Sequence, residues 1–218
     1  MEDEDKQDTI KYVPDSEPLN YMIGVSPQHL IFGGLHVTFE KKIKSKPNIW
    51  IGITPQFYSL NNPLDNDYEK YPNSLLGGGV KFSYRYYFGK YVNYRKTKTS
   101  FRTSFILAAN YQYLKFNLEN EANIWNENSN NDLITLQKED VNLNLHRGTL
   151  SFLLSLQENF GPYFIAEAYI GIGVRISDLM ADKRINGSVK KYGISEDMYD
   201  YAFTGNILLG GIKLYIAP

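Results

Sequence analysis

The stretch Tyr169–Ser177, "YIGIGVRIS", decides how the fold of this chain is interpreted. Every second residue is a branched aliphatic: Ile170, Ile172, Val174 and Ile176. The residues between them are tyrosine, glycine, arginine and serine. Such strict alternation is typical of a β-strand whose two faces meet different surroundings. In a soluble sheet the apolar face packs on a core, whereas in an outer-membrane barrel it meets lipid and the polar face lines a narrow interior.

The composition favours one all-β domain. The chain has 218 residues with 18 Tyr, 12 Phe, 17 Gly and no Cys. Abundant tyrosine interleaved with glycine is typical of barrels with aromatic girdles. A net charge of −1 without a long basic run gives no indication of a nucleic-acid partner. The absence of cysteine excludes disulfides and thiolate sites, and no apolar run reaches the roughly 18 residues that a membrane helix needs.

Alternating segments recur along the chain. Residues 1–19 are interpreted as a flexible acidic leader and residues 20–218 as an outer-membrane β-barrel domain. The clear segments are 28–43, 49–60, 75–89, 101–118, 141–157, 163–177 and 201–217. We expect an eighth strand at 18–26, turning at Pro27 and Gln28, because single-chain bacterial barrels usually have an even strand number.

The connections between these segments alternate in length. Long polar loops are expected at 61–74, 119–140 and 178–200, and a medium connection at 90–100, with short turns between the other segments. Tight periplasmic turns alternating with long external loops are typical of transmembrane barrels. The sequence therefore predicts an all-β fold, an antiparallel up-and-down transmembrane β-barrel of eight strands.

The two faces of these segments differ in polarity throughout. One face is nearly uninterrupted aliphatic and aromatic, and the other collects Glu40, Lys81, Arg85, Arg102, Glu167, Arg175 and Lys213. A globular core could not hold these ions without a penalty of several kcal/mol for each unpaired one. We therefore predict that lipid meets the apolar face and that the seven ions form a barrel-interior ionic network. An eight-stranded interior is filled by side chains and leaves no aqueous channel.

Aromatic residues cluster near the ends of two segments. They are Tyr84, Tyr86, Tyr87, Phe88, Tyr111 and Tyr113. Aromatic side chains near strand ends are typical of interfacial girdles. We expect them to anchor the barrel.

One stretch also resembles a known family. "IGVSPQHLIFGGLHVTFEKKI" (23–43) is similar to the first-strand region of small Bacteroidota outer-membrane β-barrel proteins of unknown function, with matching positions at Pro27, Gly33, Gly34, Glu40 and Lys41. "YRYYFG" (84–89) and "YIGIGVRIS" resemble later strands of that family. A typical member ends in an aromatic residue, whereas this chain ends "LYIAP". The resemblance implies a small barrel in the bacterial outer membrane and supplies no activity or functional residues.

The candidate catalytic residues do not form a convincing constellation. His36, Thr38 and Glu40 share one strand face, but successive residues on a face lie about 7 Å apart, too far for a direct proton relay. We expect an interior polar network there, and a hydrogen bond near a strand end for His146. We predict no catalytic residue and no enzymatic activity.

Two further patterns suggest ligands only weakly. Gly77–Gly79 is followed by neither a helix nor the Lys-Ser/Thr of a phosphate loop, so we expect it to relieve crowding in a curved barrel. "NPLDNDYE" (62–69) and "NENSNNDL" (126–133) offer oxygen ligands without the spacing of an EF-hand. We expect no metal and no cofactor.

The function expected from the sequence is a structural or protein-interaction role in the bacterial outer membrane. The expected partners are outer-membrane lipids and lipopolysaccharide, with other envelope proteins at the external loops and no nucleic acid. Two alternatives stay open: a lipid-modifying outer-membrane barrel enzyme, and a soluble lipocalin-like ligand-binding barrel. The tract "EDEDKQD" (2–8) also resembles the acidic tract after the lipidated cysteine of surface lipoproteins, although that cysteine is absent.

Overall fold

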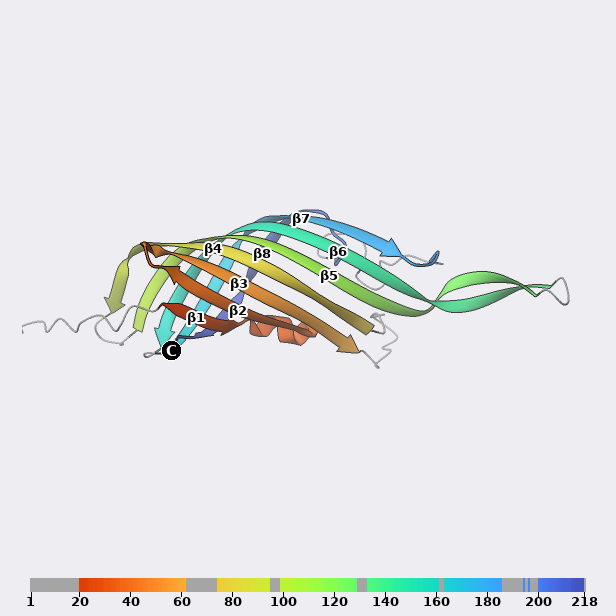
Figure 1. Cartoon of the computed structure of the whole chain (residues 1–218), viewed down its shortest axis with the longest axis horizontal. Helices are drawn as coiled ribbons and strands as arrows, with labels where there is room; N and C mark the ends of the chain where they lie inside the picture. The colour runs from red at the N-terminus through yellow and green to blue at the C-terminus, as the bar shows by residue number, and fades with distance from the viewer. Residues whose placement is uncertain are drawn as a thin grey trace, which may run out of the picture.

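In the computed structural model of this chain, eight antiparallel strands form a closed barrel in sequence order, with β1 pairing with β8 (Figure 1). The structure describes residues 20–61, 74–94, 99–128, 133–160, 163–185, 194, 196 and 200–217. The strands are β1 (Tyr21–Val25), β2 (Gly34–Ile43), β3 (Lys46–Asn61), β4 (Ser74–Tyr94), β5 (Thr99–Asn128), β6 (Leu133–Phe160), β7 (Phe164–Ala181) and β8 (Gly205–Ile216). The prediction of an all-β barrel of eight antiparallel strands is confirmed. The predicted leader, residues 1–19, lies outside the described residues.

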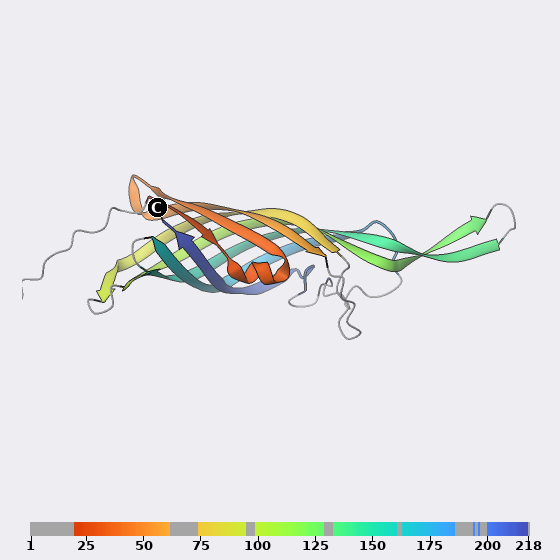
Figure 2. The same ribbon diagram turned by 90° about the horizontal axis from the view of Figure 1, so that it is seen from below.

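A short 3₁₀-helix, η1 (Pro27–Phe32), separates β1 from β2 (Figure 2). The sequence predicted a simple turn at Pro27 and Gln28 and a strand from residue 28 onward, and this prediction is wrong up to Gly33. Proline at the start of a helix has no N–H to lose and a preset φ. Gly33 ends η1 in the left-handed region, at φ 68°, which favours glycine.

The helix η1 fills part of the barrel wall. β1 pairs with β8 at three positions, Ile23–Val25 opposite Leu214–Ile216, and β8 extends well beyond them. η1 contacts both β8 and β2 where β1 has ended. No helix among the described residues is long and apolar enough to cross a membrane.

The predicted loop at 119–140 is wrong. β5 and β6 continue there as a two-stranded ribbon that projects beyond the barrel (Figure 1), with pairs from Ala122–Glu139 to Asn128–Leu133. Each ribbon strand supplies the backbone hydrogen bonds of the other, so the pairing does not depend on an apolar face. We call this end the ribbon end, and the opposite end, where β2 ends and β3 begins, β4 ends and β5 begins, and β6 ends and β7 begins, the turn end.

The other connections are shorter than expected where they are described. β4 runs to Tyr94, which shortens the predicted connection at 90–100, and β7 runs to Ala181. The predicted strand 201–217 begins at Gly205. Most of the predicted loops at 61–74 and 178–200 lies outside the described residues.

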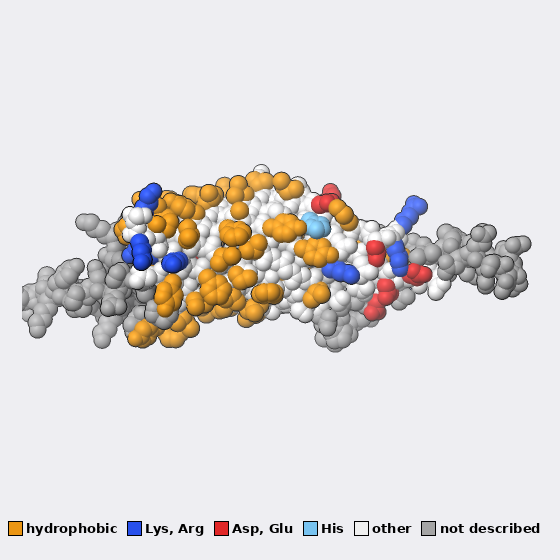
Figure 3. All heavy atoms as spheres, viewed as in Figure 1, with side chains coloured by type: hydrophobic (Ala, Val, Ile, Leu, Met, Phe, Trp, Pro, Cys, Tyr) orange, Lys and Arg blue, Asp and Glu red, His pale blue; other side chains and the backbone are white. Residues whose placement is uncertain are grey.

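Side chains alternate between the two faces as predicted. On β7, Ile170 is 66% and Ile172 63% exposed, whereas the neighbouring Glu167 is 1% exposed. In Figure 3 apolar side chains cover the middle of the visible face, and charged side chains gather toward its ends. We call the exposed apolar side chains the apolar belt; they include Leu35, Phe39, Ile51, Ile53, Phe82, Leu107, Leu150, Phe152, Leu154, Ile170, Ile172, Val174, Leu208, Ile212 and Leu214.

Of the aromatic residues expected to form girdles, most of the tyrosines face outward. Tyr84, Tyr86, Tyr111 and Tyr113 are exposed on the outer face, but Tyr87 is buried inside the barrel. Tyr87 follows an outward residue, and its side chain therefore points inward.

Apolar clusters close the interior at both ends. The turn end holds Met22, Trp50, Tyr87, Ile165, Tyr215 and Ala217. The ribbon end holds a larger cluster built from Tyr58, Leu75, Leu114, Phe116, Leu118, Ala122, Val141, Leu143, Leu145, Ile194 and Ala202. Buried polar and charged residues occupy the space between these clusters.

Candidate functional site

Four of the seven predicted interior ions meet in one ionic cluster near the turn end: Glu40 from β2, Arg85 from β4, Glu167 from β7 and Lys213 from β8. The Arg85 guanidinium binds Glu40 in a bidentate manner, with Nε–Oε2 at 2.8 Å and Nη2–Oε1 at 2.9 Å. Its Nη2 also lies 2.8 Å from Glu167 Oε2. Lys213 Nζ lies 3.9 Å from Glu40 Oε1 and 3.7 Å from Glu167 Oε1. Two cations thus face two carboxylates.

The register of the strands makes room for this cluster. Glu40 lies opposite Gly52, and Gly52 lies opposite Ser83 in the next strand. A Cβ on Gly52 would lie 2.9 Å from Glu40 Cγ and 2.5 Å from Ser83 Oγ. Glycine at this position therefore lets the Glu40 side chain cross toward Arg85.

Neutral side chains bond most of the remaining polar atoms of the ionic cluster, whereas Glu167 Oε1 has no hydrogen bond and faces Lys213 Nζ at 3.7 Å. Arg85 Nη1 donates to Ser104 Oγ at 2.9 Å and to Ser155 Oγ at 3.0 Å. Tyr215 Oη donates to Glu40 Oε1 at 3.0 Å, and Gln157 Nε2 donates to Glu167 Oε2 at 2.7 Å. A buried ion pair is tolerated only when its lone pairs and protons are bonded in this way.

The other three predicted ions lie elsewhere. Arg102 lies with its guanidinium carbon 4.3 Å from the centre of the Tyr87 ring, at the turn end. Lys81 and Arg175 lie on the ribbon-end side of the cluster, in a row that the register connects through Asn110 and Thr149. The seven residues that the sequence predicted as one ionic network therefore lie in three places: the ionic cluster, the turn end beside Tyr87, and the row on the ribbon-end side.

A second polar group lies toward the ribbon end; the sequence predicted only His36 as part of an interior polar network there and missed its partners. Tyr58 Oη lies 2.7 Å from His36 Nε2 and also bonds Gln112, which in turn bonds Gln56 and Arg147. All of these residues have inward parity on their strands. The alternation along each strand could have placed these side chains inside the barrel. Glutamine and tyrosine are uncharged, however, and their residue types do not distinguish an interior position from a surface position.

The candidate catalytic residues each engage a different partner. His36 bonds Tyr58, Thr38 Oγ1 lies 3.0 Å from Thr54 Oγ1, and Glu40 binds Arg85. His29 stacks on His36 with 3.7 Å between ring centres. His146 is on the outer face of β6, with Nδ1 2.8 Å from Tyr111 Oη.

The side chains of the oxygen-rich patterns at 62–69 and 126–133 lie outside the described residues. Within the described ranges no three His, Cys, Asp or Glu side chains group together as metal ligands. Gly77 and Gly79 lie within β4, where added Cβ atoms would meet the carbonyl oxygens of Tyr113 and Tyr111 at 2.4 and 2.5 Å. These glycines therefore relieve crowding, as predicted.

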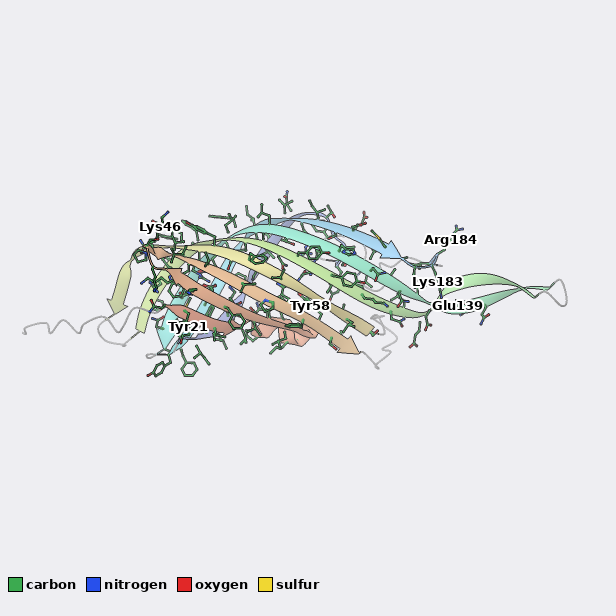
Figure 4. The ribbon with its side chains drawn as sticks, viewed as in Figure 1. Tyr21, Lys46, Tyr58, Glu139, Lys183 and Arg184 are labelled. Atoms are coloured by element: carbon green, nitrogen blue, oxygen red, sulfur yellow. The ribbon has the colours of Figure 1, made fainter. Side chains whose placement is uncertain are left out.

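Polar contacts tie the base of the ribbon to the segment after β7. Lys183 Nζ lies 2.7 Å from Glu139 Oε2 (Figure 4), and this hydrogen bond raises the pKa of Lys183. Desolvation would raise the pKa of Asp182, but the hydrogen bonds from the backbone and side chain of Asn142 lower it. A backbone bridge joins Ala122 to Ile185. The ribbon is thus fixed at its base.

Comparison with solved structures finds a likeness to CarO of Acinetobacter baumannii. The two chains are 9% identical, the match covers 92% of this chain and 98% of CarO, and the TM-score is 0.37. No family model and no curated protein matches the sequence. The closed barrel follows from the strand pairing of this chain itself, and the resemblance to Bacteroidota barrels stays a prediction.

Proposed function

We propose that this chain spans a bacterial outer membrane as an eight-stranded β-barrel and has a structural or protein-interaction role there. The observation that carries the membrane placement is the apolar belt. On β7 the outward residues from Phe164 to Ile176 are all apolar. Twelve steps of about 3.3 Å give about 40 Å along the strand. At a tilt of about 45° this spans about 28 Å in depth, which matches the hydrocarbon thickness of a bilayer.

A soluble lipocalin-like barrel fits the two faces less well. Its ligand would need an apolar cavity, whereas this interior holds Glu40, Arg85, Glu167 and Lys213. An apolar belt of this extent exposed to water would favour association. Lipid contact accounts for both faces together.

The ribbon supports the interaction role. Its strands pair only with each other beyond Ala122 in the described part of the chain, apart from the bridge to Ile185. Each strand therefore has an edge that can add a strand of another protein. The Glu139–Lys183 and Asn142–Asp182 contacts hold the ribbon to the barrel, so binding at the ribbon is anchored at the membrane.

A lipid-modifying enzyme is the second candidate, and one observation favours it. His146 and Tyr111 form an outward pair at the edge of the apolar belt, where lipid headgroups would lie. A single His–Tyr pair lacks the third group that orients the base in nucleophilic catalysis. We therefore propose a role without catalysis, and turnover of lipid A or phospholipid that His146→Ala abolishes would establish the enzyme instead.

Site-specific photocrosslinking in native outer membranes tests the interaction role. A photoreactive residue replaces Lys138, which is exposed on the ribbon, and in a matched control it replaces Lys46 at the turn end (Figure 4). We expect a discrete protein adduct from position 138 only. Adducts that are absent from the ribbon, or equal at both positions, contradict the proposed role. Recovery of the chain outside the outer-membrane fraction contradicts the membrane placement.

A further inference from the structure

A row of inward side chains crosses four neighbouring strands on the ribbon-end side of the ionic cluster. Lys81 lies opposite Asn110, Asn110 opposite Thr149, and Thr149 opposite Arg175. Adjacent strands lie about 4.8 Å apart. The four side chains therefore leave the barrel wall side by side, with a cation at each end of the row.

The polar groups of this row lack partners. Asn110 Oδ1 and Arg175 Nε are buried without a hydrogen bond. Lys81 makes no hydrogen bond and no ion pair of 4 Å or less within the described residues, although it lies in electrostatic range of Glu40 and Glu167. A bound anion would accept from the free Arg175 Nε–H, whereas Asn110 Oδ1 is an acceptor and needs a donor.

The charge of this region is also unbalanced. Arg147 bonds Gln112, the carbonyl of Tyr201 and Tyr58, which are neutral. The charged or titratable neighbours of Arg147 and Arg175 are Tyr58, Tyr201, His29, His36 and each other, with no carboxylate among the described residues. In the ionic cluster, by contrast, Glu40 and Glu167 neutralise both cations. Lys81, Arg147 and Arg175 are partly buried, and partly buried cations without counterions favour the binding of an anion.

We propose that Lys81, Arg147 and Arg175 form a phosphate-binding site inside the barrel. Guanidinium groups bind phosphate oxygens in a bidentate manner, and a lysine adds a point charge. The Asn110 amide and the Thr149 hydroxyl supply further donors to a group with several oxygens. The proposed site thus offers three cationic side chains and an amide donor to one anion with several oxygens.

The helix η1, which forms part of the barrel wall, is compatible with two sources of the phosphate: a free ion, or the headgroup of a lipid. Gln28 Nε2 donates to Tyr169 Oη at 3.2 Å and His29 stacks on His36, so these residues close the interior. Leu30 and Ile31 of the same helix are exposed on the outside. The phosphate is therefore either free or the headgroup of a lipid that enters beside η1, and the chemistry of the site is the same in both cases.

Titration of the full chain, folded in zwitterionic detergent, tests the site. We expect inorganic phosphate to bind by calorimetry in one arm, or micelles doped with phosphatidylglycerol to load the barrel in native mass spectrometry in the other. Lys81→Met and Arg175→Gln each weaken the binding by about tenfold or more, since each removes a charge-assisted bond. Lys115→Met, on the outer face of β5, leaves it unchanged.

The outcomes separate the two sources and can overturn the site. Binding of inorganic phosphate identifies a free anion, and loading by phosphatidylglycerol but not phosphatidylcholine identifies a headgroup. Neither kind of binding, or binding that both variants leave unchanged, overturns the proposal. Heat-modifiable electrophoretic mobility shows which variants fold, and Arg175→Gln keeps the test available if Lys81→Met does not. None of these results depends on whether the ribbon binds a protein.

Discussion

Replacing Ile170 by arginine tests which face of the barrel meets lipid. Ile170 is 66% exposed and lies midway between Phe164 and Ile176 on the outer face of β7. Six residue steps of about 3.3 Å lie on either side, about 14 Å in depth at a tilt of about 45°. Ile170 would therefore sit near the bilayer midplane, where a lipid-facing arginine costs about 2–4 kcal/mol. In water the same exposed position would tolerate arginine within about 0.5 kcal/mol.

Met180→Arg is the matched control on the same strand and face. Met180 is exposed and lies ten steps from Ile170, about 33 Å along the strand and about 23 Å in depth, beyond the half-thickness of about 15 Å. We expect it to cost about 0–1 kcal/mol. The assay is urea-dependent folding into phosphatidylcholine vesicles, followed by tryptophan fluorescence. Equal and small costs for the two variants would refute the orientation of the barrel, whatever its strand count.

Three further predictions concern packing and charge. Arg85→Met leaves Glu40 without its buried partner and should cost about 3–5 kcal/mol in the same urea assay; a cost below about 1 kcal/mol would show that the ionic cluster is not buried. Gly52→Val should cost about 1–3 kcal/mol, because its Cβ would crowd Ser83 at 2.5 Å, whereas Gly148→Ala, with no neighbouring atom within 4 Å, should be neutral. The pKa of Asp182 is lowered from 3.8, so its contribution to holding the ribbon base is present above that value and lost as the pH falls through the lower folded pKa. Hydrogen-exchange protection of the Asn142 amide should fall over that range in the wild type, and Asp182→Ala should remove this pH dependence.

The presence of the strands and the direction of their side chains could be predicted because one physical cause, the contrast between lipid outside and polar partners inside, controls both. A residue such as Ile172 can satisfy an exposed position only against lipid, and a residue such as Glu167 only among polar partners. Alternation with period two therefore reports the two environments directly. It found seven of the eight strands and assigned Arg85 and Lys213 to the interior, while β1 was expected from the even strand number of bacterial barrels.

The errors fall where alternation carries no information about the backbone. Residues 28–32 include the apolar run "LIF" (30–32), which a strand and a short helix share, and the left-handed conformation of Gly33 decides between them. The ribbon strands at 119–128 and 133–140 pair outside the barrel, where no lipid imposes a pattern. Their polar sequence therefore predicted a loop although residues 122–128 pair with residues 133–139.

The grouping of the interior ions could not be predicted from alternation along a strand. Alternation shows whether a side chain points inward, but not at which level along the barrel it meets the side chains of the other strands. Arg85 and Lys81 are both inward on β4, four residues and about 13 Å apart along the strand. Register then places Arg85 beside the carboxylates and Lys81 in the row with Asn110. One strand thus contributes a cation to a neutralised cluster and another to a region with excess positive charge. Stability should therefore depend mainly on the turn-end cluster, and ligand binding on the ribbon-end row, because Glu40 and Glu167 pair with Arg85 and Lys213, whereas among the described residues no carboxylate lies within 4 Å of the cations of the row.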